Sequence, residues 1–197
     1  MQRSIWTIPS QRKFLRQPCQ PVETFGEPLK QLAQDFLDTW KTVAAYGIAA
    51  PQIGVNLRAF IWKGIDMDEP EVIVNPRLLQ AHGSVKDYDG CLSVPGIYGP
   101  TRRAETIEIS GYDLAGQFFK RTMSGFNARI IQHEMDHLEG ILFIDRIDRV
   151  NELYVLQKTG QIVDGEEEYE QQALPLSSKA IVMSARKPVP AQFKYGK

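Results

Sequence analysis

Cysteine is scarce in this chain of 197 residues, which contains only Cys19 and Cys91. Two cysteines give no disulfide framework and suit a reducing compartment, so we expect a cytoplasmic protein. No apolar run approaches the roughly 18 residues that span a membrane. The formal charge is −1, which lacks the positive excess of a nucleic-acid-binding protein. These absences exclude a secreted disulfide scaffold, and they predict that neither DNA nor a membrane is a partner.

The composition is ordinary for one globular domain, with 43% apolar and 24% charged residues. Apolar residues at spacings of three and four predict helices at Glu27–Ala45 and at about Gly125–Leu138. Short β-rich runs predict four strands, at 58–62, 71–74, 105–110 and 117–122. Between them, residues 89–101 are interrupted by glycine and proline. Because the helices and strands do not alternate regularly, the pattern indicates an α+β fold.

The second predicted helix carries His133 and His137, two of the three histidines in the chain. Residues four apart lie on one face of a helix, so both imidazoles point the same way. Apolar Phe126 and Ile130 continue this face. The opposite stripe is polar and consists of Arg129, Gln132, Asp136 and Glu139. We therefore expect antiparallel strands to surround a central buried helix whose histidines face the core.

Two imidazoles in a core need hydrogen bonds or a metal, because unpaired polar groups are costly there. The pair His133 and His137, with Glu134 beside the first histidine, has the HExxH spacing of metal-dependent hydrolases. Glu134 can reach the same centre and act as a general base. His82 lies in a polar stretch without such a partner, and we expect it at the surface.

A catalytic site of this kind needs a third protein ligand. No histidine follows His137, whereas several glutamates do. Cys91 is the other candidate, next to Gly90, which allows close approach of the backbone. A cysteine in an apolar neighbourhood is most often a small core residue, and Cys19 keeps that interpretation. The residues alone leave the choice between Cys91 and a glutamate open.

Three motifs resemble, in this order, the signature motifs of the peptide deformylase family. They are YGIAAPQIG at 46–54, DGCLSVPG at 89–96 and QHEMDHLEG at 132–140. Residues 9–22 are similar to the start of the family's mature domain, and the resemblance covers about residues 5–150. It implies a metallohydrolase domain at 1–150. Residues 151–197 would form a C-terminal extension with a mobile end from about 187.

The resemblance implies a hydrolase that removes the formyl group from formyl-methionyl nascent peptides during protein biosynthesis. It implies a divalent metal, Fe²⁺ first, with Zn²⁺, Ni²⁺ or Co²⁺ as substitutes, held by Cys91, His133 and His137. A thiolate among the ligands suits iron as well as zinc. Glu134 would be the base. Gln52 and the backbone N–H of Leu92 would stabilise the developing oxyanion.

The resemblance also implies that the substrate backbone pairs with the first two motifs as an added strand. Gly47, Ile48 and Gly90 are the predicted binding residues there. Phe126 and Ile130 are the candidates for the pocket of the methionine side chain, with ordinary core packing as the alternative.

Two positions depart from the family pattern. Ala45 stands where the family has glycine, which is tolerable if its φ is negative. Asp89 replaces a glutamate that would anchor the metal-bearing strand through Arg103. The aspartate is shorter by one methylene, so the pair must move closer or use a bridging water.

Two other functions compete with deformylation. One is a general metallopeptidase with a glutamate as third ligand. The other is a deformylase-like protein that binds formyl peptides or the ribosome with little turnover. The ribosome near its exit tunnel is a candidate partner for the mildly basic C-terminal end.

Overall fold

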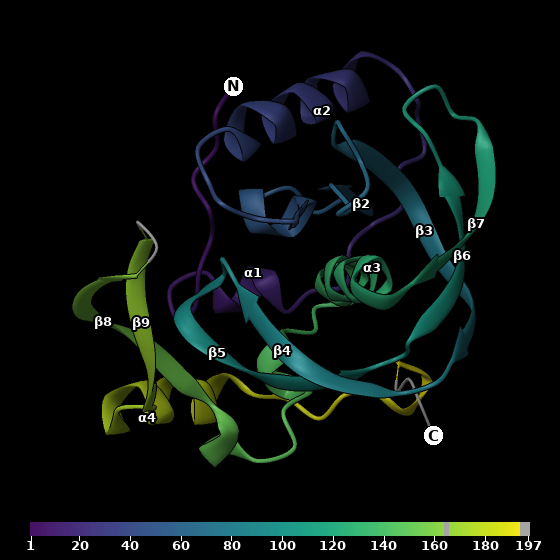
Figure 1. The fold of residues 1–197 in the computed structure, drawn as a ribbon. Helices are drawn as coiled ribbons and strands as arrows, with labels where there is room; N and C mark the ends of the chain where they lie inside the picture. The colour runs from purple at the N-terminus through teal and green to yellow at the C-terminus, as the bar shows by residue number, and fades with distance from the viewer. Residues whose placement is uncertain (164–165, 194–197) are drawn as a thin grey trace.

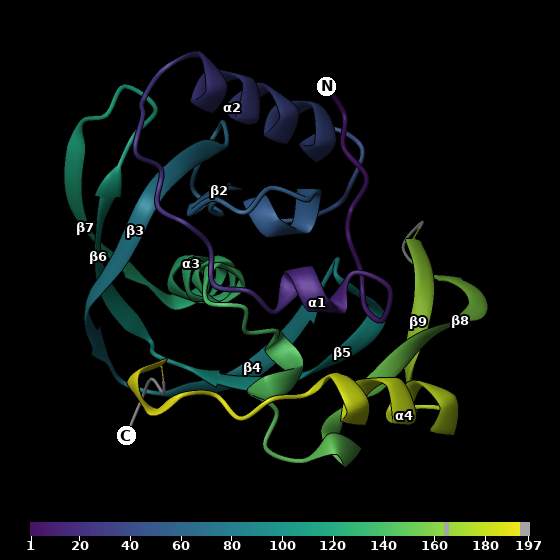
Figure 2. The ribbon, with the colours of Figure 1, turned by 180° about the vertical axis from the view of Figure 1, so that it is seen from behind.

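The computed structural model describes residues 1–163 and 166–193 as helices combined with two antiparallel sheets (Figures 1 and 2). One sheet has the order β1-β2-β3-β6-β7, and the other has the order β4-β5-β8-β9. The strands are β1 Gly47–Ala49, β2 Ala59–Trp62, β3 Glu71–His82, β4 Val85–Cys91, β5 Val94–Arg103, β6 Thr106–Tyr112, β7 Phe118–Ser124, β8 Tyr154–Val163 and β9 Glu166–Ala173. The helices are α1 Arg12–Leu15, α2 Glu27–Trp40, α3 Gly125–Leu138 and α4 Leu176–Ala185. This mixture of helices with antiparallel sheets agrees with the predicted class.

Helix α3 begins and ends where its sequence predicts, from Gly125 to Leu138. Figure 1 shows it nearly end-on, with β4 and β5 on one side and β2 on the other. Ten of its residues are buried. Three members of the predicted polar stripe, Arg129, Gln132 and Asp136, are among them. The stripe was therefore wrongly expected to face away from the core.

The polar stripe can be buried because each side chain has a partner. Gln132 binds the backbone of Ala104 twice, accepting at Oε1 and donating from Nε2, both at 2.9 Å. Arg129 donates to the Thr101 hydroxyl at 2.9 Å, and Asp136 is paired with Arg103 at 2.8 Å. Hydrogen bonds of this kind offset the desolvation of polar groups.

Helix α2 ends at Trp40, five residues before the predicted end at Ala45. The hydrogen bonding there changes from the α-helical to the 3₁₀ pattern, because the N–H of Thr42 donates to the carbonyl of Thr39, three residues earlier. The hydroxyl of Thr42 donates to the same carbonyl at 2.8 Å.

Two strand predictions are corrected. Strand β3 continues through Asn75-Pro76 to His82, because a register shift between Val74 and Arg77 accommodates the proline. The glycine- and proline-containing stretch 89–101 lies within the β4–β5 hairpin, whose tight turn joins Cys91 to Val94. Glycine does not end the strand here. It allows the side chain of Leu153 to pack closely on the backbone, since a Cβ at Gly99 would lie 2.8 Å from Leu153.

The C-terminal segment forms more structure than its weak sequence pattern indicated. Strands β8 and β9 pair as a hairpin that extends the β4–β5 sheet. Helix α4 packs below them in Figure 1 and buries Val182 and Ala185. Beyond it, the segment from about residue 187, predicted to be mobile, makes hydrogen bonds from Lys187 to Asp145 and from Arg146 to Phe193. Residues 194–197 of that segment lie outside the described residues.

No helix in residues 1–163 or 166–193 is long and apolar enough to span a membrane.

Candidate metal centre

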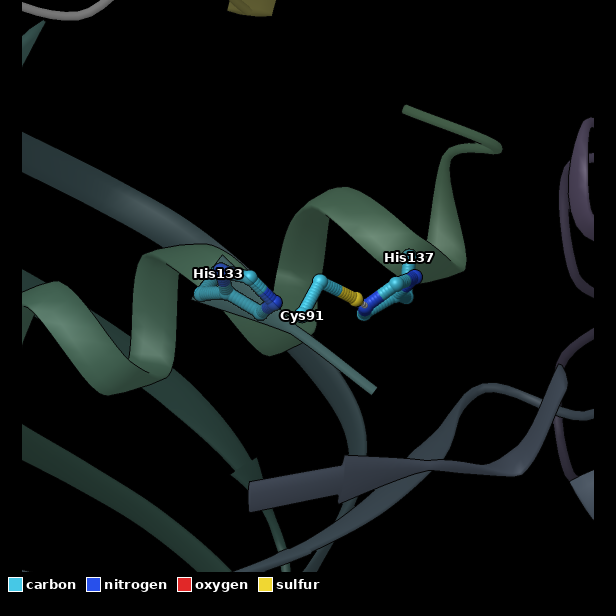
Figure 3. Close-up of side chains that lie close together, drawn as sticks. All are labelled: Cys91, His133 and His137. Atoms are coloured by element: carbon cyan, nitrogen blue, oxygen red, sulfur yellow. Dashed lines mark hydrogen bonds between the residues drawn. The ribbon is translucent and has the colours of Figure 1, made fainter. Parts of the chain in front are cut away.

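Three side chains from two elements meet beside α3. Cys91 ends strand β4, and His133 and His137 lie one turn apart on α3. Each offers one ligand atom, and these atoms lie within 4.8 Å of one another. Figure 3 shows the sulfur of Cys91 directed toward the ring of His137, with the ring of His133 on the other side. The α-helical spacing and the strand end thus bring together the three residues that the resemblance implies as ligands.

The donor atoms of this cluster fit a divalent metal. Nδ1 of His133 is hydrogen-bonded to Asp89 at 2.8 Å, so Nε2 is the ring nitrogen that can act as a ligand. Nε2 of His137 lies 3.2 Å from Sγ of Cys91. The other ring nitrogen of His137, Nδ1, is buried and has no hydrogen-bond partner among the described residues. One thiolate and two imidazoles form a donor set for zinc or iron.

Asp89 is the centre of a buried ion-pair network next to the ligands. Its Oδ2 accepts from Arg103 Nη2 at 2.7 Å and from Thr101 at 2.8 Å. The predicted pair with Arg103 is therefore confirmed, and it is direct rather than bridged by water. Burial alone would raise the pKa of Asp89, but Arg103 and His133 outweigh it and hold the pKa far below its usual value. The sequence did not predict the contact with His133.

The two histidines differ in their surroundings. Burial lowers the pKa of both, but the carboxylate of Asp89 raises the pKa of His133 well above its ordinary value. Burial and the neighbouring His133 hold the pKa of His137 well below it. A lowered pKa favours the neutral ring, which is the form of histidine that can bind a metal.

Glu134 is buried beside the ligands, with 3% of its surface exposed. Burial raises its pKa to about 7. Its Oε2 has no hydrogen-bond partner among the described residues. The carboxylate occupies space that only a glycine leaves free, since a Cβ on Gly47 would lie 2.2 Å from Oε1. Strand β1 thus needs glycine at this position to accommodate Glu134.

Gln52 lies in the short 3₁₀ turn Ala50–Ile53 that follows β1. Its Oε1 accepts from the backbone of Ala49 at 2.8 Å, and this bond fixes which way the amide points. Its Nε2 faces the ligands, 3.6 Å from Sγ of Cys91 and 3.3 Å from the Ser93 hydroxyl. Gln52 is therefore a buried donor and not a solvated loop residue.

A cavity of about 510 Å³ opens over these residues. Of the predicted site residues, its lining contains Gly47, Gln52, Gly90, Cys91, Leu92, Phe126, Ile130, His133 and Glu134. Ile48 does not line it, because its side chain is fully buried in a core cluster of α2 and the first sheet. Ala45 lines the cavity and has no positive φ, since Asn75 is the one non-glycine residue with positive φ among those described.

Several lining residues were missed by the sequence analysis. Tyr46, Tyr88, Ile97 and Tyr98 all line the cavity. Tyr46 is the first residue of one motif and Tyr88 directly precedes another, which was the available signal, whereas Tyr98 lies on a strand that was not predicted. The other histidine and the other cysteine lie where the sequence predicts: His82 is exposed at the end of β3, and Cys19 is buried in a core cluster.

A family model described as Polypeptide deformylase matches residues 3–152 of the chain. A peptide deformylase from Dictyoglomus thermophilum is 42% identical over 134 residues, covering 68% of this chain and 86% of the relative. The crystal structure of a peptide deformylase from Legionella pneumophila superposes with a TM-score of 0.71 at 41% identity, covering 76% of this chain and 88% of the other. A peptide deformylase from Synechococcus elongatus, solved in complex with actinonin, gives a TM-score of 0.75 at 29% identity and covers 95% of this chain and 91% of the other.

Proposed function

This chain belongs to the peptide deformylase family and removes the formyl group from nascent peptides, and we propose that Cys91, His133 and His137 hold its metal. The observation that supports this assignment is the cluster of these three ligand atoms beside the buried carboxylate of Glu134. Three of these four residues lie on helix α3, which therefore sets most of the geometry of the site. The proposed metal is iron(II), with zinc, nickel or cobalt as substitutes, because the thiolate suits iron as well as zinc and the family resemblance favours iron(II).

When bound, the metal supplies a Lewis acid that polarises the formyl carbonyl and acidifies water. Glu134 takes a proton from the attacking water and delivers it to the leaving amine. Its pKa, raised to about 7 by burial, suits a group that must both accept and return a proton near neutral pH. Its unpaired Oε2 is available for that proton.

Gln52 and Leu92 stabilise the developing oxyanion. The amide of Gln52 is held by Ala49 so that its Nε2 points toward the ligand cluster. The backbone N–H of Leu92 directly follows Cys91 in the tight turn of the β4–β5 hairpin. Removing one such donor typically costs about 100- to 1000-fold in rate.

The substrate lies in the cavity as an extra strand between the segments of Gly47 and Gly90. Ile48 contributes its backbone alone, because its side chain is buried in the core. Phe126 and Ile130 receive the methionine side chain, since both line the cavity on the same helix as the histidines. Phe126 is 39% exposed, and its ring packs edge-on against Tyr46 with the centroids 4.9 Å apart.

The test is formate release from formyl-Met-Ala-Ser by protein loaded anaerobically with iron(II). Glu134→Ala is the matched control, because it removes the base and leaves all three ligands. We expect turnover in the wild type and a loss of about 100- to 10,000-fold in the variant. Metal and peptide binding without any formate would instead favour a formyl-peptide-binding protein.

A second experiment separates this site from that of a general metallopeptidase. With Cys91 as a ligand, Cys91→Ser loses the metal or binds it far more weakly. With a glutamate as third ligand, Cys91→Ser would retain the metal. Metal content after dialysis, measured by atomic emission, distinguishes the two.

We further propose that residues 1–150 form the catalytic unit of a cytoplasmic enzyme and that 151–197 are an extension. The ribosome near its exit tunnel is the proposed partner of the extension's basic end. If truncation after Ala185 leaves co-sedimentation with ribosomes unchanged across salt concentrations, this partner is wrong.

A further inference from the structure

The C-terminal hairpin joins the catalytic domain at the wall of the active-site cavity. The register between β5 and β8 places Tyr98 opposite Tyr154. Their rings stack, with centroids 5.9 Å apart and planes at 24°. Tyr88 meets the same ring edge-on, 5.9 Å away at 90°. Tyr88 and Tyr98 line the cavity, where their rings can face a bound peptide, whereas Tyr154 does not line it. Tyr154 therefore packs behind these two rings.

Tyr98 also packs directly on the strand that ends in Cys91. It pairs with Gly90 across the β4–β5 hairpin. A Cβ on Gly90 would lie 2.7 Å from the Tyr98 ring, so the ring lies against bare backbone. The position of this ring is therefore set on one side by Gly90 and on the other by Tyr154.

Neighbouring contacts hold Tyr154 in place. Leu153, the residue before it, is buried at 2% exposure and contacts Gly99. Glu152 pairs with Lys86 of β4 at 2.7 Å, which ties the start of β8 to the hairpin that carries Cys91. Tyr154 is thus fixed relative to the cavity and not carried on a free arm.

We propose that Tyr154 is a positioning residue that holds Tyr98 and Tyr88 as an aromatic wall, and that this wall selects apolar and aromatic side chains downstream of the formyl-methionine. The proposal rests on the deformylase function proposed above. Aromatic rings favour stacked or edge-to-face contact with other apolar groups, and such pairs contribute beyond simple burial. A wall of this kind discriminates among nascent peptides by the residues that follow the first one.

The experiment compares two substrates of the iron-loaded enzyme. Formyl-methioninamide lacks downstream residues, whereas formyl-Met-Ala-Phe offers an aromatic side chain to the wall. We expect Tyr154→Ala to raise KM for formyl-Met-Ala-Phe about 3- to 10-fold with kcat unchanged. For formyl-methioninamide, kcat/KM should stay within about twofold, because that substrate does not reach the wall. Tyr154→Phe should restore the wild-type KM, since it retains the ring.

Tyr169→Ala is the matched control, because Tyr169 is a half-exposed tyrosine on the same hairpin that does not line the cavity. A double-mutant cycle tests whether Tyr154 acts through Tyr98. If it does, Tyr154→Ala raises KM less in the Tyr98→Ala background than in the wild type, and it adds nothing once Tyr88 is also alanine.

Two outcomes overturn the proposal. One is an equal change for both substrates, which would indicate general destabilisation. The other is an unchanged KM for formyl-Met-Ala-Phe in Tyr154→Ala. If the wild type itself releases no formate from either substrate, the proposed function fails instead, so the two failures are distinguishable. Should Tyr154→Ala not fold, the Tyr98→Ala variant alone must raise KM selectively for formyl-Met-Ala-Phe, and an unselective effect rejects the proposal.

Discussion

Asp89 accepts a hydrogen bond from Nδ1 of His133 at 2.8 Å while its other oxygen is paired with Arg103 at 2.7 Å. One carboxylate thus links strand β4, which carries Cys91, to helix α3, which carries both histidines. In the neutral ring of His133, the bond to Asp89 keeps the proton on Nδ1 and leaves Nε2 for a metal. The shorter aspartate reaches both partners directly, so this departure from the family pattern preserves the anchoring contact.

Replacing Asp89 by asparagine should weaken metal binding. Asp89→Asn keeps the size of the side chain but loses the charge that orients His133 and pairs with Arg103. Loss of such a supporting carboxylate typically costs about 10- to 100-fold in metal affinity. Competition with a chelating dye for zinc measures this without reference to activity. Exposed Asp87, two residues earlier on β4, supplies the control Asp87→Asn, and equal affinities in both variants would contradict the prediction.

A Cβ at Gly47 should displace the proposed base without unfolding the protein. In Gly47→Ala the new methyl would lie 2.2 Å from Oε1, 2.4 Å from Cδ and 2.6 Å from Cγ of Glu134, so the side chain must swing away from Cγ outward. We expect kcat to fall about 100- to 10,000-fold, the usual contribution of a general base. Metal content should stay unchanged, because the added methyl group meets Glu134, which is not one of the three proposed ligands.

The control for this variant is Gly26→Ala, where the nearest atom to the added Cβ is 3.9 Å away. Formate release and metal content are measured for both variants. A Gly47→Ala enzyme with wild-type kcat would show that Glu134 can move freely, and would contradict the role of Gly47 as space for the base.

The sequence predicted the elements whose signals are local, and it missed those that depend on contacts between residues far apart in the chain. Helix α3 was correctly bounded, because the apolar spacing that predicted it is a local signal. The β4–β5 hairpin was missed, because its glycines and prolines resemble a loop until their partners are known. Gly90 and Gly99 are required by the ring of Tyr98 and the side chain of Leu153, and neither contact can be recognised from local sequence.

The candidate site divides in the same way. The residues predicted as ligands and base lie together because motif spacing on one helix fixes most of their geometry. The polar stripe of α3 was assigned to the wrong environment, since Arg129 and Asp136 are buried against Thr101 and Arg103 of β5. Tyr154 carried no signal, because its contact with Tyr98 joins two distant parts of the chain.

The ion pair between Arg3 and buried Asp35 should make stability pH-dependent at low pH. Burial would raise the pKa of Asp35, but hydrogen bonds from the N-terminal ammonium, Arg3 and Gln31 outweigh it and lower the pKa to about 2. A lowered pKa means that the folded state favours the carboxylate. Its contribution is therefore complete above about pH 4 and is lost as the pH falls toward 2.

Asp35→Asn should lose about 1–3 kcal/mol of unfolding free energy at neutral pH, the usual cost of removing a charged hydrogen-bond acceptor. The deficit should shrink from pH 4 downward as the wild type loses the same interaction. Urea unfolding at a series of pH values measures the difference. Asp68→Asn on an exposed loop is the control. A stability deficit of Asp35→Asn that stays constant from pH 7 to pH 3 would contradict the prediction.

The two cysteines should differ sharply in their reaction with a thiol reagent, and a metal should protect one of them. Burial raises the pKa of Cys19 to about 12, so at pH 8 only about one molecule in 10,000 carries the reactive thiolate. Cys91 is partly exposed to the cavity and should react rapidly in metal-free folded protein. Added zinc should slow the labelling of Cys91, because the ligand sulfur is then bound, and should leave the labelling of Cys19 unchanged.

Peptide mapping by mass spectrometry after timed alkylation identifies which cysteine is labelled. Denatured protein, in which both cysteines react, defines complete labelling. If zinc fails to protect Cys91, the sulfur is not a ligand, whatever the activity of the enzyme.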